Sequence, residues 1–530
     1  MAPISKSPHS NGNDEEFTDF SVCIQSLTVV STSPYVLFKG HEEWQLLEDS
    51  ESSDSEVDDQ DIISKHDLAT APLMTREAHI ITRHNGRVAQ YGVLGRILSI
   101  QYKGEAESIS DQRLYLNTNA PFSAIVCGVQ GSGKSHTVAT ILENMMISDF
   151  PAIGSLAKPL SGLVLHYGEG GANSLPNETA WLSSSISSFV HGPPVIVYVS
   201  RASLQTMRAV YKPLGEKVVV EPLVFDNSEL DAAAFLSMMA VGSTESAPLY
   251  MQIVLSILRD LGERFTFSLF LQNLEVHKQK FNPAQLAGLE QRLMLLTAFL
   301  ADPSITTITK KKAAVQVPVK EKPCRFQPGQ LTIFDLSDPF LDTASACGLF
   351  EIIIRLFVRA DVGTGKVLVV DEAHKYLSSE RSSTGLKKAL LGLIRQQRHL
   401  AMRVIISTQE PTVVPPVLLD LCSIAILHRF SSPTWWQHLI QHVPTDFSQS
   451  DAFDKVVKLQ TGHAIVLAPS GIGLFAQSEN VNGKQPFSKT AAKAENSGKI
   501  LARFGRRYLV VKTRKRVTAD GGASILVIGS

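Results

Sequence analysis

The stretch at residues 121–146, PFSAIVCGVQGSGKSHTVATILENMM, decides which fold the chain can form. Its opening part, PFSAIVC, is mostly apolar and favours a buried strand. A glycine-rich run follows at once, and the residues after Lys134 favour a helix. A buried strand that runs through a glycine loop into a helix is typical of a phosphate-binding site on an α/β sheet.

The glycine-rich run at residues 128–135, GVQGSGKS, matches the pattern G-x-x-x-x-G-K-[ST] in full. Glycines let backbone N–H groups turn inward around phosphates, and the helix that follows adds its positive N-terminal end. Lys134 can reach the β- and γ-phosphates, and the hydroxyl of Ser135 is placed to bind Mg²⁺. The nucleotide-binding candidates are Gly128, Gly131, Ser132, Gly133, Lys134, Ser135 and His136.

A second candidate element is the stretch at residues 367–372, VLVVDE, in which apolar residues precede two acids. A buried parallel strand would deliver Asp371 and Glu372 to the carboxyl edge of the sheet, where ligands bind in open α/β folds. Asp371 is suited to hold Mg²⁺ through its water shell, and Glu372 to orient and deprotonate an attacking water. The alternative, a strand that ends at an exposed acidic turn, is outweighed by the glycine loop upstream.

Three further polar residues are candidates for catalysis. The strand MRVIIST ends at Thr408, so Gln409 would lie at the same edge and could bind the γ-phosphate or the water as a sensor. Otherwise it is an ordinary exposed glutamine. The helix LKKALLGLIRQQRHL carries Arg395 and Arg398 on a polar side. In an oligomer Arg398, or alternatively Arg395, could reach a neighbour's γ-phosphate; the other interpretation is a solvated helix face.

Strands and helices alternate over most of the chain, which predicts an α/β fold whose mainly parallel sheet is flanked by helices. Residues 42–61 hold ten acids and no Lys or Arg, so self-repulsion should keep them open. We expect a disordered acidic region at 1–70 and a small β-rich entry segment at 71–119. The core should cover 120–478 and include a helical insertion at about 228–302 and an exposed loop at about 303–327. A polar, basic and disordered tail should follow at 479–530.

The composition bounds the class of protein. Of 530 residues, 44% are hydrophobic and 19% charged, which is a globular balance. The formal net charge of -1 gives no overall attraction to nucleic acid or membrane, so any basic surface must be local. The cysteines are scattered without a C-x-x-C pair, and the sequence has neither an apolar run that could span a bilayer nor a secretory signal. We therefore expect an intracellular protein, cytoplasmic or nuclear.

Two basic clusters are candidates for contact with phosphate backbones or for a nuclear address. One is KKK at residues 310–312, and the other comprises Arg506, Arg507, Lys512, Arg514, Lys515 and Arg516. Runs of this kind more often only solvate a surface, so both interpretations stay open. Trp435 and Trp436 could stack on bases, although packing in the interior is the more common role.

Taken together, these motifs resemble the HerA/FtsK-like branch of additional-strand P-loop ATPases. The resemblance is carried by GVQGSGKSHT, LTIFDLSDP before a long helix, VLVVDEAHKYL, and RQQRHLAMRVIISTQEPTVVPPVLLDLCSIAILHRF. TGHAIVLAP looks like the strand that closes the family's core, so the similarity covers roughly residues 120–478. It implies a RecA-type core that binds ATP and Mg²⁺, with Asp371 and Glu372 as the metal-binding and catalytic acids, Gln409 as the sensor and Arg398 on the basic helix.

The resemblance also implies a homo-oligomer, often a hexameric ring with ATP sites between subunits. In that family the rings pump DNA or support transport, so a DNA-translocating motor ATPase is one hypothesis. A nucleotide-switched interaction protein, or an ATPase that remodels proteins without acting on nucleic acid, is the alternative.

Overall fold

The computed structural model describes residues 63–83, 90–107, 109–171, 173–226, 229–239, 249–279, 281–301, 324–377, 384–443, 449–476 and 499–522. They belong to one unit that begins at Ile63. The acidic segment at 42–61 and the basic residues 310–312 lie outside the described residues, as does most of the loop expected at 303–327.

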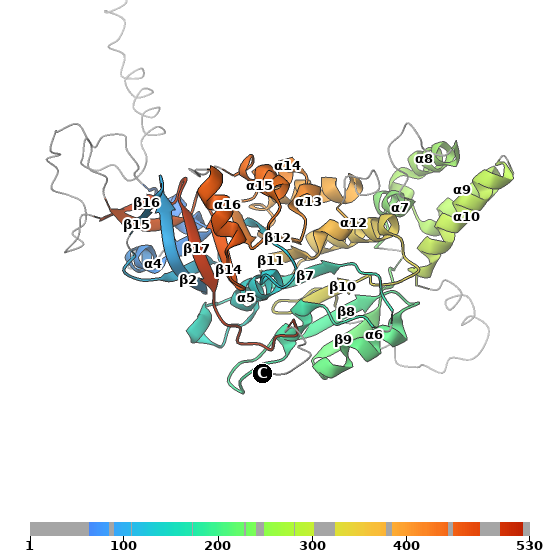
Figure 1. The fold of residues 1–530 in the computed structure, drawn as a ribbon. Helices are drawn as coiled ribbons and strands as arrows, with labels where there is room; N and C mark the ends of the chain where they lie inside the picture. The colour runs from blue at the N-terminus through green and yellow to red at the C-terminus, as the bar shows by residue number, and fades with distance from the viewer. Residues whose placement is uncertain are drawn as a thin grey trace, which may run out of the picture. The chain divides into compact units, whose positions relative to one another are not determined.

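The described residues form one large mixed sheet, in which eight parallel strands extend inward from the edge strand β9 (Figure 1). Its parallel strands, in spatial order, are β9 (Val218–Pro222), β8 (Val195–Val199), β10 (Leu331–Asp335), β7 (Ser161–His166), β11 (Lys366–Val370), β12 (Met402–Thr408), β5 (Ser123–Cys127) and β13 (Ile424–His428). Antiparallel pairing continues the sheet through β14 (His463–Leu467), β17 (Tyr508–Thr513), β2 (Tyr91–Tyr102), β4 (Arg113–Asn117) and β1 (Leu73–Thr75). Beyond β1 lie β15 (Ile472–Ala476) and β16 (Lys499–Arg503), while β3 (Glu105–Glu107) and β6 (Gly154–Ser155) pair with β2.

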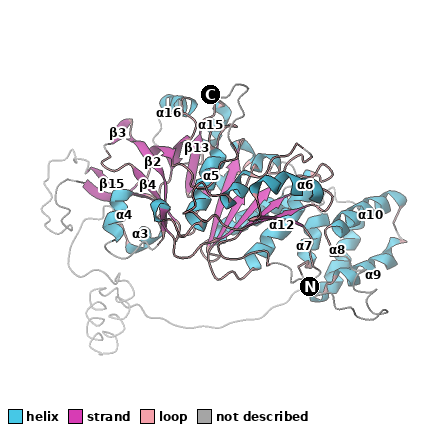
Figure 2. Ribbon diagram, turned by 90° about the horizontal axis from the view of Figure 1, so that it is seen from below, coloured by secondary structure: helices cyan, strands magenta, loops and turns pink. Residues whose placement is uncertain are grey.

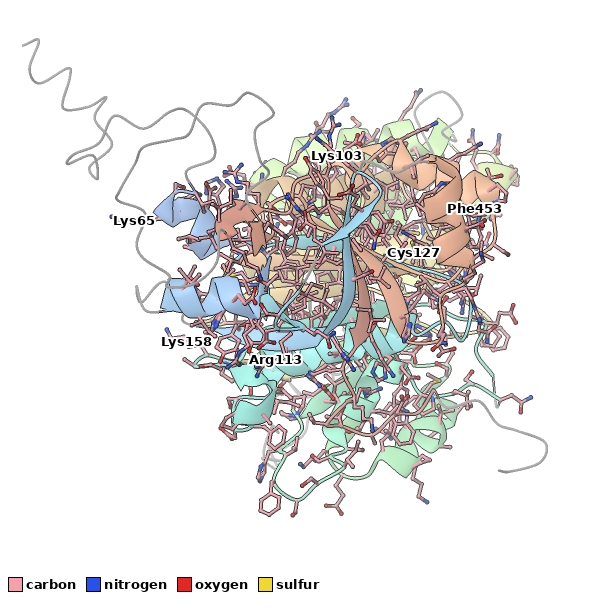
Figure 3. The ribbon with its side chains drawn as sticks, turned by 60° about the vertical axis from the view of Figure 1, so that its left-hand side comes forward. Lys65, Lys103, Arg113, Cys127, Lys158 and Phe453 are labelled. Atoms are coloured by element: carbon pink, nitrogen blue, oxygen red, sulfur yellow. The ribbon has the colours of Figure 1, made fainter. Side chains whose placement is uncertain are left out.

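Side chains on the parallel strands alternate between two cores, one on each face of the sheet. On β11, Val369 faces one core and Val370 the other, and both are fully buried. Helices α5 (Lys134–Met146) and α6 (Leu204–Tyr211) cover the first face, and α12 (Thr343–Arg359), α13 (Thr384–Gln396), α14 (Pro416–Asp420), α15 (Pro433–Ile440) and α16 (Gln449–Val457) cover the second (Figure 1, Figure 2). Cys127 is fully buried at the end of β5, whereas Lys103 is exposed after β2 (Figure 3). The predicted α/β fold with helices on both faces of the sheet is confirmed, and the parallel strands form one part of a mixed sheet.

The region between β9 and β10, expected to be a helical insertion, forms helices α7 (Ala232–Met239), α8 (Leu249–Leu261), α9 (Phe267–Lys278) and α10 (Pro283–Ala298). α10 starts at a capping box between Asn282 and Gln285, with Pro283 in the first turn. Phe235 on α7 packs against Phe270 on α9, with ring centroids 4.3 Å apart. Among the described helices, these included, none combines the length and apolar character needed to cross a bilayer.

The segment before the glycine loop contains more helix than the sequence predicted. Strands β1 to β4 agree with the β-rich entry expected at 71–119, but α4 (Arg76–Arg83) lies between β1 and β2. The expected disordered region at 1–70 is also wrong for its last residues, because Lys65–Thr70 form helix α3. Ser64 and Asp67 form a capping box that satisfies the first N–H groups of this helix.

The expectation of a tail after residue 479 needs a larger correction. Lys499–Arg503 and Tyr508–Thr513 are strands β16 and β17, and β17 pairs with both β14 and β2 inside the sheet. Leu509 is 0% exposed and Val511 is 2% exposed. The basic residues that flank YLVV suggest a solvated segment, whereas the continuous apolar run between them favours a buried strand.

Candidate functional site

The register of three parallel strands brings the sequence-predicted elements to one edge of the sheet. Ile406 on β12 pairs with Ile125 on β5 and with Val370 on β11. The glycine loop follows β5, the two acids follow β11, and Gln409 follows β12. Because all three strands run in the same direction, these segments meet at their carboxyl ends, although about 240 residues separate the loop from the acids.

The glycine loop has the backbone geometry that phosphate binding requires. Gly131 and Gly133 have φ angles of 71° and 111°, in the region that favours glycine. A Cβ atom at Gly133 would lie 2.9 Å from the amide nitrogen of Gly462, so only glycine fits there. α5 then begins at Lys134 without a side-chain cap, which leaves its first N–H groups for a ligand. The chain has the P-loop NTPase fold.

The strand order specifies the type of P-loop fold. β12 lies between β5, which carries the phosphate loop, and β11, which carries the acids. β12 is thus an additional strand between the loop-bearing and the acid-bearing strands, a position that only the structure reveals. It also puts Gln409 between the loop and the acids, because Gln409 follows the inserted strand.

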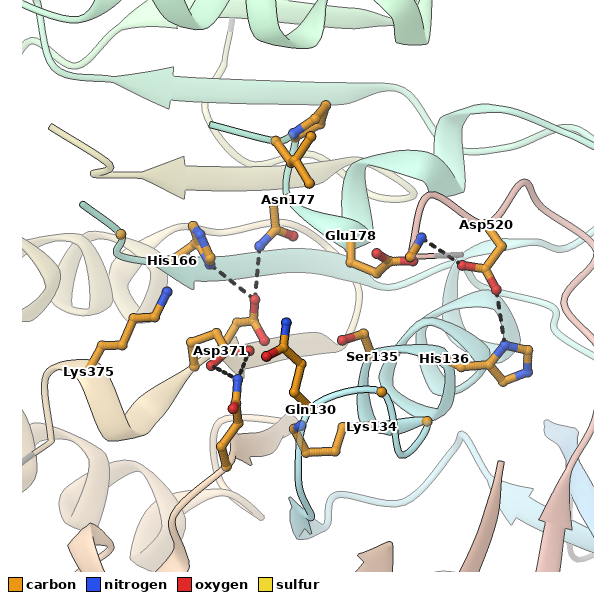
Figure 4. Close-up of a pocket in the computed structure, with 18 of the residues that line it drawn as sticks. Gln130, Lys134, Ser135, His136, His166, Asn177, Glu178, Asp371, Lys375 and Asp520 are labelled. Atoms are coloured by element: carbon orange, nitrogen blue, oxygen red, sulfur yellow. Dashed lines mark hydrogen bonds and ion pairs between the residues drawn. The ribbon is translucent and has the colours of Figure 1, made fainter. Parts of the chain in front are cut away.

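Eight of the sequence-predicted site residues line one cleft of about 1300 Å³ (Figure 4). They are Gly131, Gly133, Lys134, Ser135, His136, Asp371, Glu372 and Gln409. Gly128 and Ser132 do not line it: Gly128 packs against His428, and the hydroxyl of Ser132 donates to the carbonyl of Val129 at 2.7 Å. Arg395 in the last turn of α13 and Arg398 in the turn that follows the helix are exposed, and both lie outside the cleft.

Lys134 is held against the backbone of the loop. Its Nζ donates to the carbonyl of Val129 at 3.0 Å, and the residue is only 5% exposed. Burial lowers the pKa of Lys134, while the negative charge of Glu372 opposes this shift. A phosphate group would supply a stronger acceptor than the carbonyl, since charge-assisted hydrogen bonds are about twice as strong as neutral ones.

Glu372 and Gln409 form a hydrogen-bonded pair at the cleft. The amide Nε2 of Gln409 donates to both carboxylate oxygens of Glu372, at 2.9 and 3.1 Å. Glu372 also has a φ of 50°, which is uncommon for a residue with a side chain. Such backbone strain costs on the order of 1–3 kcal/mol and clusters at functional sites. The paired Gln409 is thus not an ordinary surface glutamine.

Asp371 is fixed by two residues that the sequence did not reveal. Nδ1 of His166 and Nδ2 of Asn177 both donate to Oδ2 of Asp371, at 3.1 and 2.9 Å. Burial by itself would raise the pKa of Asp371, but these hydrogen bonds outweigh it and the pKa is lowered. Asp371 is therefore a carboxylate anion of fixed orientation at neutral pH.

Asn177 is itself held in one orientation. Its Oδ1 accepts hydrogen bonds from the N–H and hydroxyl of Thr179, so its Nδ2 must point at Asp371. Its backbone N–H donates to the hydroxyl of Tyr211, which donates to Asp335 at 2.7 Å. His166 and Asp335 could have been found, because each ends a strand, in LVLH and LTIFD. Asn177 lies in a loop that carries no such pattern.

The donor groups of the cleft fit a magnesium ion. Mg²⁺ prefers oxygen ligands and usually keeps several waters while it binds one or two protein oxygens and substrate phosphates. The hydroxyl of Ser135 and the ionised Asp371 supply such oxygens on facing sides of the cleft (Figure 4). Ser135 and Asp371 would hold the ion, and His166 and Asn177 would orient Asp371 from behind.

The chain was compared with protein families, curated proteins and solved structures. No protein-family model matches the chain, and no curated protein is detectably similar to it. Similar solved structures are VirB4 of Thermoanaerobacter pseudethanolicus (12% identity, 72% of this chain and 94% of that chain, TM-score 0.38) and the bacterial conjugative coupling protein TrwB (12%, 71% and 93%, 0.38). A third is the genome packaging NTPase B204 from Sulfolobus turreted icosahedral virus 2 in complex with ATP-gammaS (10%, 66% and 92%, 0.27). The phosphate loop and the strand order identify the fold.

We expect Asn177→Ser to weaken metal binding without weakening metal-free nucleotide binding. Serine keeps the N-cap of the turn at Thr179 but loses the amide that donates to Asp371. Loss of such an outer-shell partner typically costs about 10–100-fold in metal affinity. The measurement is Mn²⁺ binding to the nucleotide complex by electron paramagnetic resonance. Thr179→Val is the matched control, because it removes a hydroxyl from Asn177 and leaves the donor to Asp371. Unchanged Mn²⁺ affinity in Asn177→Ser would contradict the role of Asn177.

Proposed function

We propose that this chain hydrolyses ATP in a Mg²⁺-dependent reaction at the cleft. The observation that carries the proposal is the meeting of three distant segments there: the loop residues 131–136, the acids Asp371 and Glu372, and Gln409. The loop supplies a phosphate cradle, the two acids supply a metal-binding oxygen and a general base, and Gln409 holds that base in place.

The residues divide the chemistry between them. Lys134 and the N–H groups at the start of α5 bind the β- and γ-phosphates, and Ser135 and Asp371 hold the ion. When bound, Mg²⁺ neutralises charge that develops on the transferred phosphoryl group. Glu372 accepts the proton of the attacking water while Gln409 keeps its carboxylate in place. A carboxylate has about four acceptor sites, so Glu372 can hold the water and Gln409 together.

The resemblance to HerA/FtsK-like ATPases leads us to propose a motor that acts as an oligomer, with DNA as its first candidate substrate. A specific observation favours the alternative, a protein-remodelling or nucleotide-switched ATPase. Three arginines of the basic C-terminal cluster are used inside the fold: Arg507 binds Glu107 at 2.9 Å, Arg514 binds Glu143 at 2.6 Å and Arg516 binds Glu178 at 3.3 Å. Of the two tryptophans that could stack on bases, Trp436 is 4% exposed and Trp435 is half-buried.

Two variants separate binding from hydrolysis. Lys134→Ala should lose most nucleotide affinity, because it removes the charge that holds the phosphates. Glu372→Gln should keep nucleotide affinity but lower hydrolysis by about 10²–10⁴-fold, because it removes the general base and leaves the cradle. Calorimetric binding of ATP and phosphate release measure the two effects. An equal loss of binding in both variants would refute this division of roles.

The motor hypothesis predicts that DNA stimulates ATP hydrolysis. The measurement is the rate of phosphate release with and without double-stranded DNA at fixed salt, since electrostatic contacts with DNA are strongly salt-dependent. Lys134→Ala serves as the control for contaminating ATPases. If no nucleic acid changes the rate while wild-type hydrolysis persists, the translocase proposal fails and the remodelling alternative is favoured.

We expect Arg398 to act on the nucleotide of a neighbouring subunit. Its exposed position outside its own cleft suits such a role, and an arginine in trans can supply about 10³–10⁵ in rate. Arg398→Ala alone should be nearly inactive, and mixing it with Lys134→Ala subunits should restore activity, because each supplies what the other lacks. The same mixture made with Arg395→Ala is the control. Full activity of Arg398→Ala alone would exclude the role.

A further inference from the structure

The last described residues form a segment that we call the C-terminal strap (residues 514–522). It follows β17 and passes along α5, the helix that follows the phosphate loop. Arg514, Lys515, Asp520 and Gly522 line the same cleft as the loop. The strap is therefore a wall of the candidate nucleotide site, although the sequence placed it in a tail.

A buried carboxylate anchors the strap to α5. Glu143 is 0% exposed, and its Oε1 accepts hydrogen bonds from the N–H groups of Val517 and Thr518, at 3.0 and 2.9 Å, and from the Thr518 hydroxyl at 2.6 Å. Its Oε2 accepts from Nη1 of Arg514 at 2.6 Å. A carboxylate buried this deeply is tolerated only when it is paired and hydrogen-bonded, so Glu143 requires the strap as its partner.

A second anchor lies on the other side of the strap. The Arg516 side chain is 2% exposed, and its Nη1 donates to Glu178 at 3.3 Å. Its Nε and Nη2 both face the hydroxyl of Thr518, at 3.4 and 3.2 Å. Glu178 follows Asn177, which binds Asp371. The strap is thus bonded both to the phosphate-loop helix and to the loop that holds the metal-binding acid.

The direction of a bound nucleotide follows from the positions of the phosphate groups. The γ-phosphate must lie near Lys134 and the acids Asp371 and Glu372, because these residues act on it. His136 is the next cleft residue beyond Ser135, and its Nε2 donates to the carbonyl of Arg514 at 2.8 Å. Figure 4 shows His136 and Asp520 together at the end of the cleft away from Asp371. The ribose and base, which follow the α-phosphate, would therefore lie against the strap.

We propose that the C-terminal strap forms the ribose-and-base wall of the nucleotide site and that Glu143 is the positioning residue that holds it there. The inference rests on the proposed function, because it takes the direction of the nucleotide from the phosphate loop. It adds that residues 514–522 of the same chain contribute to the affinity for the ribose and base of a nucleotide, and not to the affinity for its phosphates. Glu143 itself does not line the cleft and acts only through the strap.

The experiment compares ATP with inorganic tripolyphosphate, which occupies the phosphate loop but has neither ribose nor base. Glu143→Gln replaces an acceptor oxygen with an amide that faces donor groups, and it removes the charge that pairs with Arg514. We expect calorimetric affinity for Mg²⁺–ATP to fall about tenfold, the equivalent of one lost charged hydrogen bond, while affinity for Mg²⁺–tripolyphosphate stays within about twofold. Thr518→Val removes one hydroxyl from Glu143 at constant shape and should show the same selectivity to a smaller extent.

The matched control is Glu351→Gln on α12, a glutamate that is 9% exposed, pairs with Arg355 and lies outside the cleft. It should leave both affinities unchanged, and thermal unfolding without ligand should verify that each variant is folded. Equal weakening of ATP and tripolyphosphate in Glu143→Gln and Thr518→Val would overturn the inference, because the strap would then support the phosphate loop instead. Unchanged affinity for both ligands in these two variants would also overturn the inference. If wild-type protein bound neither ligand, the proposed function itself would fail.

Discussion

The parallel register of β5, β12 and β11 is the constraint on which the site depends. Each residue pair along these strands is fixed by the ladder, and a shift by one residue would turn every side chain to the other face of the sheet. Since both faces are packed against helices, such a shift would move each side chain into the opposite core, where its size and shape do not fit. The phosphate loop, Gln409 and the two acids therefore meet at one edge as a consequence of core packing.

Buried charges in this protein are placed where hydrogen-bond donors or acceptors surround them. Asp371 accepts from His166 and Asn177, and Glu143 accepts from the strap. Arg403 on β12 is handled differently: its guanidinium donates to the carbonyls of Thr118, Asn119 and Ala401, and burial lowers its pKa to about 10. Asp371 and Glu143 each have several hydrogen-bond donors, which makes their positions sensitive to the segments that supply those donors.

The phosphate loop and the acids could be predicted from the sequence because their chemistry requires particular residue types at fixed spacing. Glycine at position 133 and lysine at position 134 meet requirements of phosphate binding that few other residue types meet, and VLVVDE is a buried strand with acids at its end. His166 and Asp335 followed the same rule at the ends of β7 and β10, but a single polar residue after an apolar run is a weak signal. Asn177 and the strap gave no signal, because hydrogen bonds to distant segments leave no periodic pattern.

By itself, the sequence determined the α/β class, the phosphate loop, the acid-bearing strand and Gln409, since these features depend on residue types and hydrophobic patterns within short segments of the chain. Only the tertiary structure decided that β12 lies between the loop and the acids, that His166 and Asn177 orient Asp371, and that residues 499–522 belong to the fold. The basic residues there suggested a solvated tail because charge is visible in a sequence, whereas the partner that neutralises it is not. Glu143 lies about 370 residues from Arg514 along the chain, and only folding brings the two together.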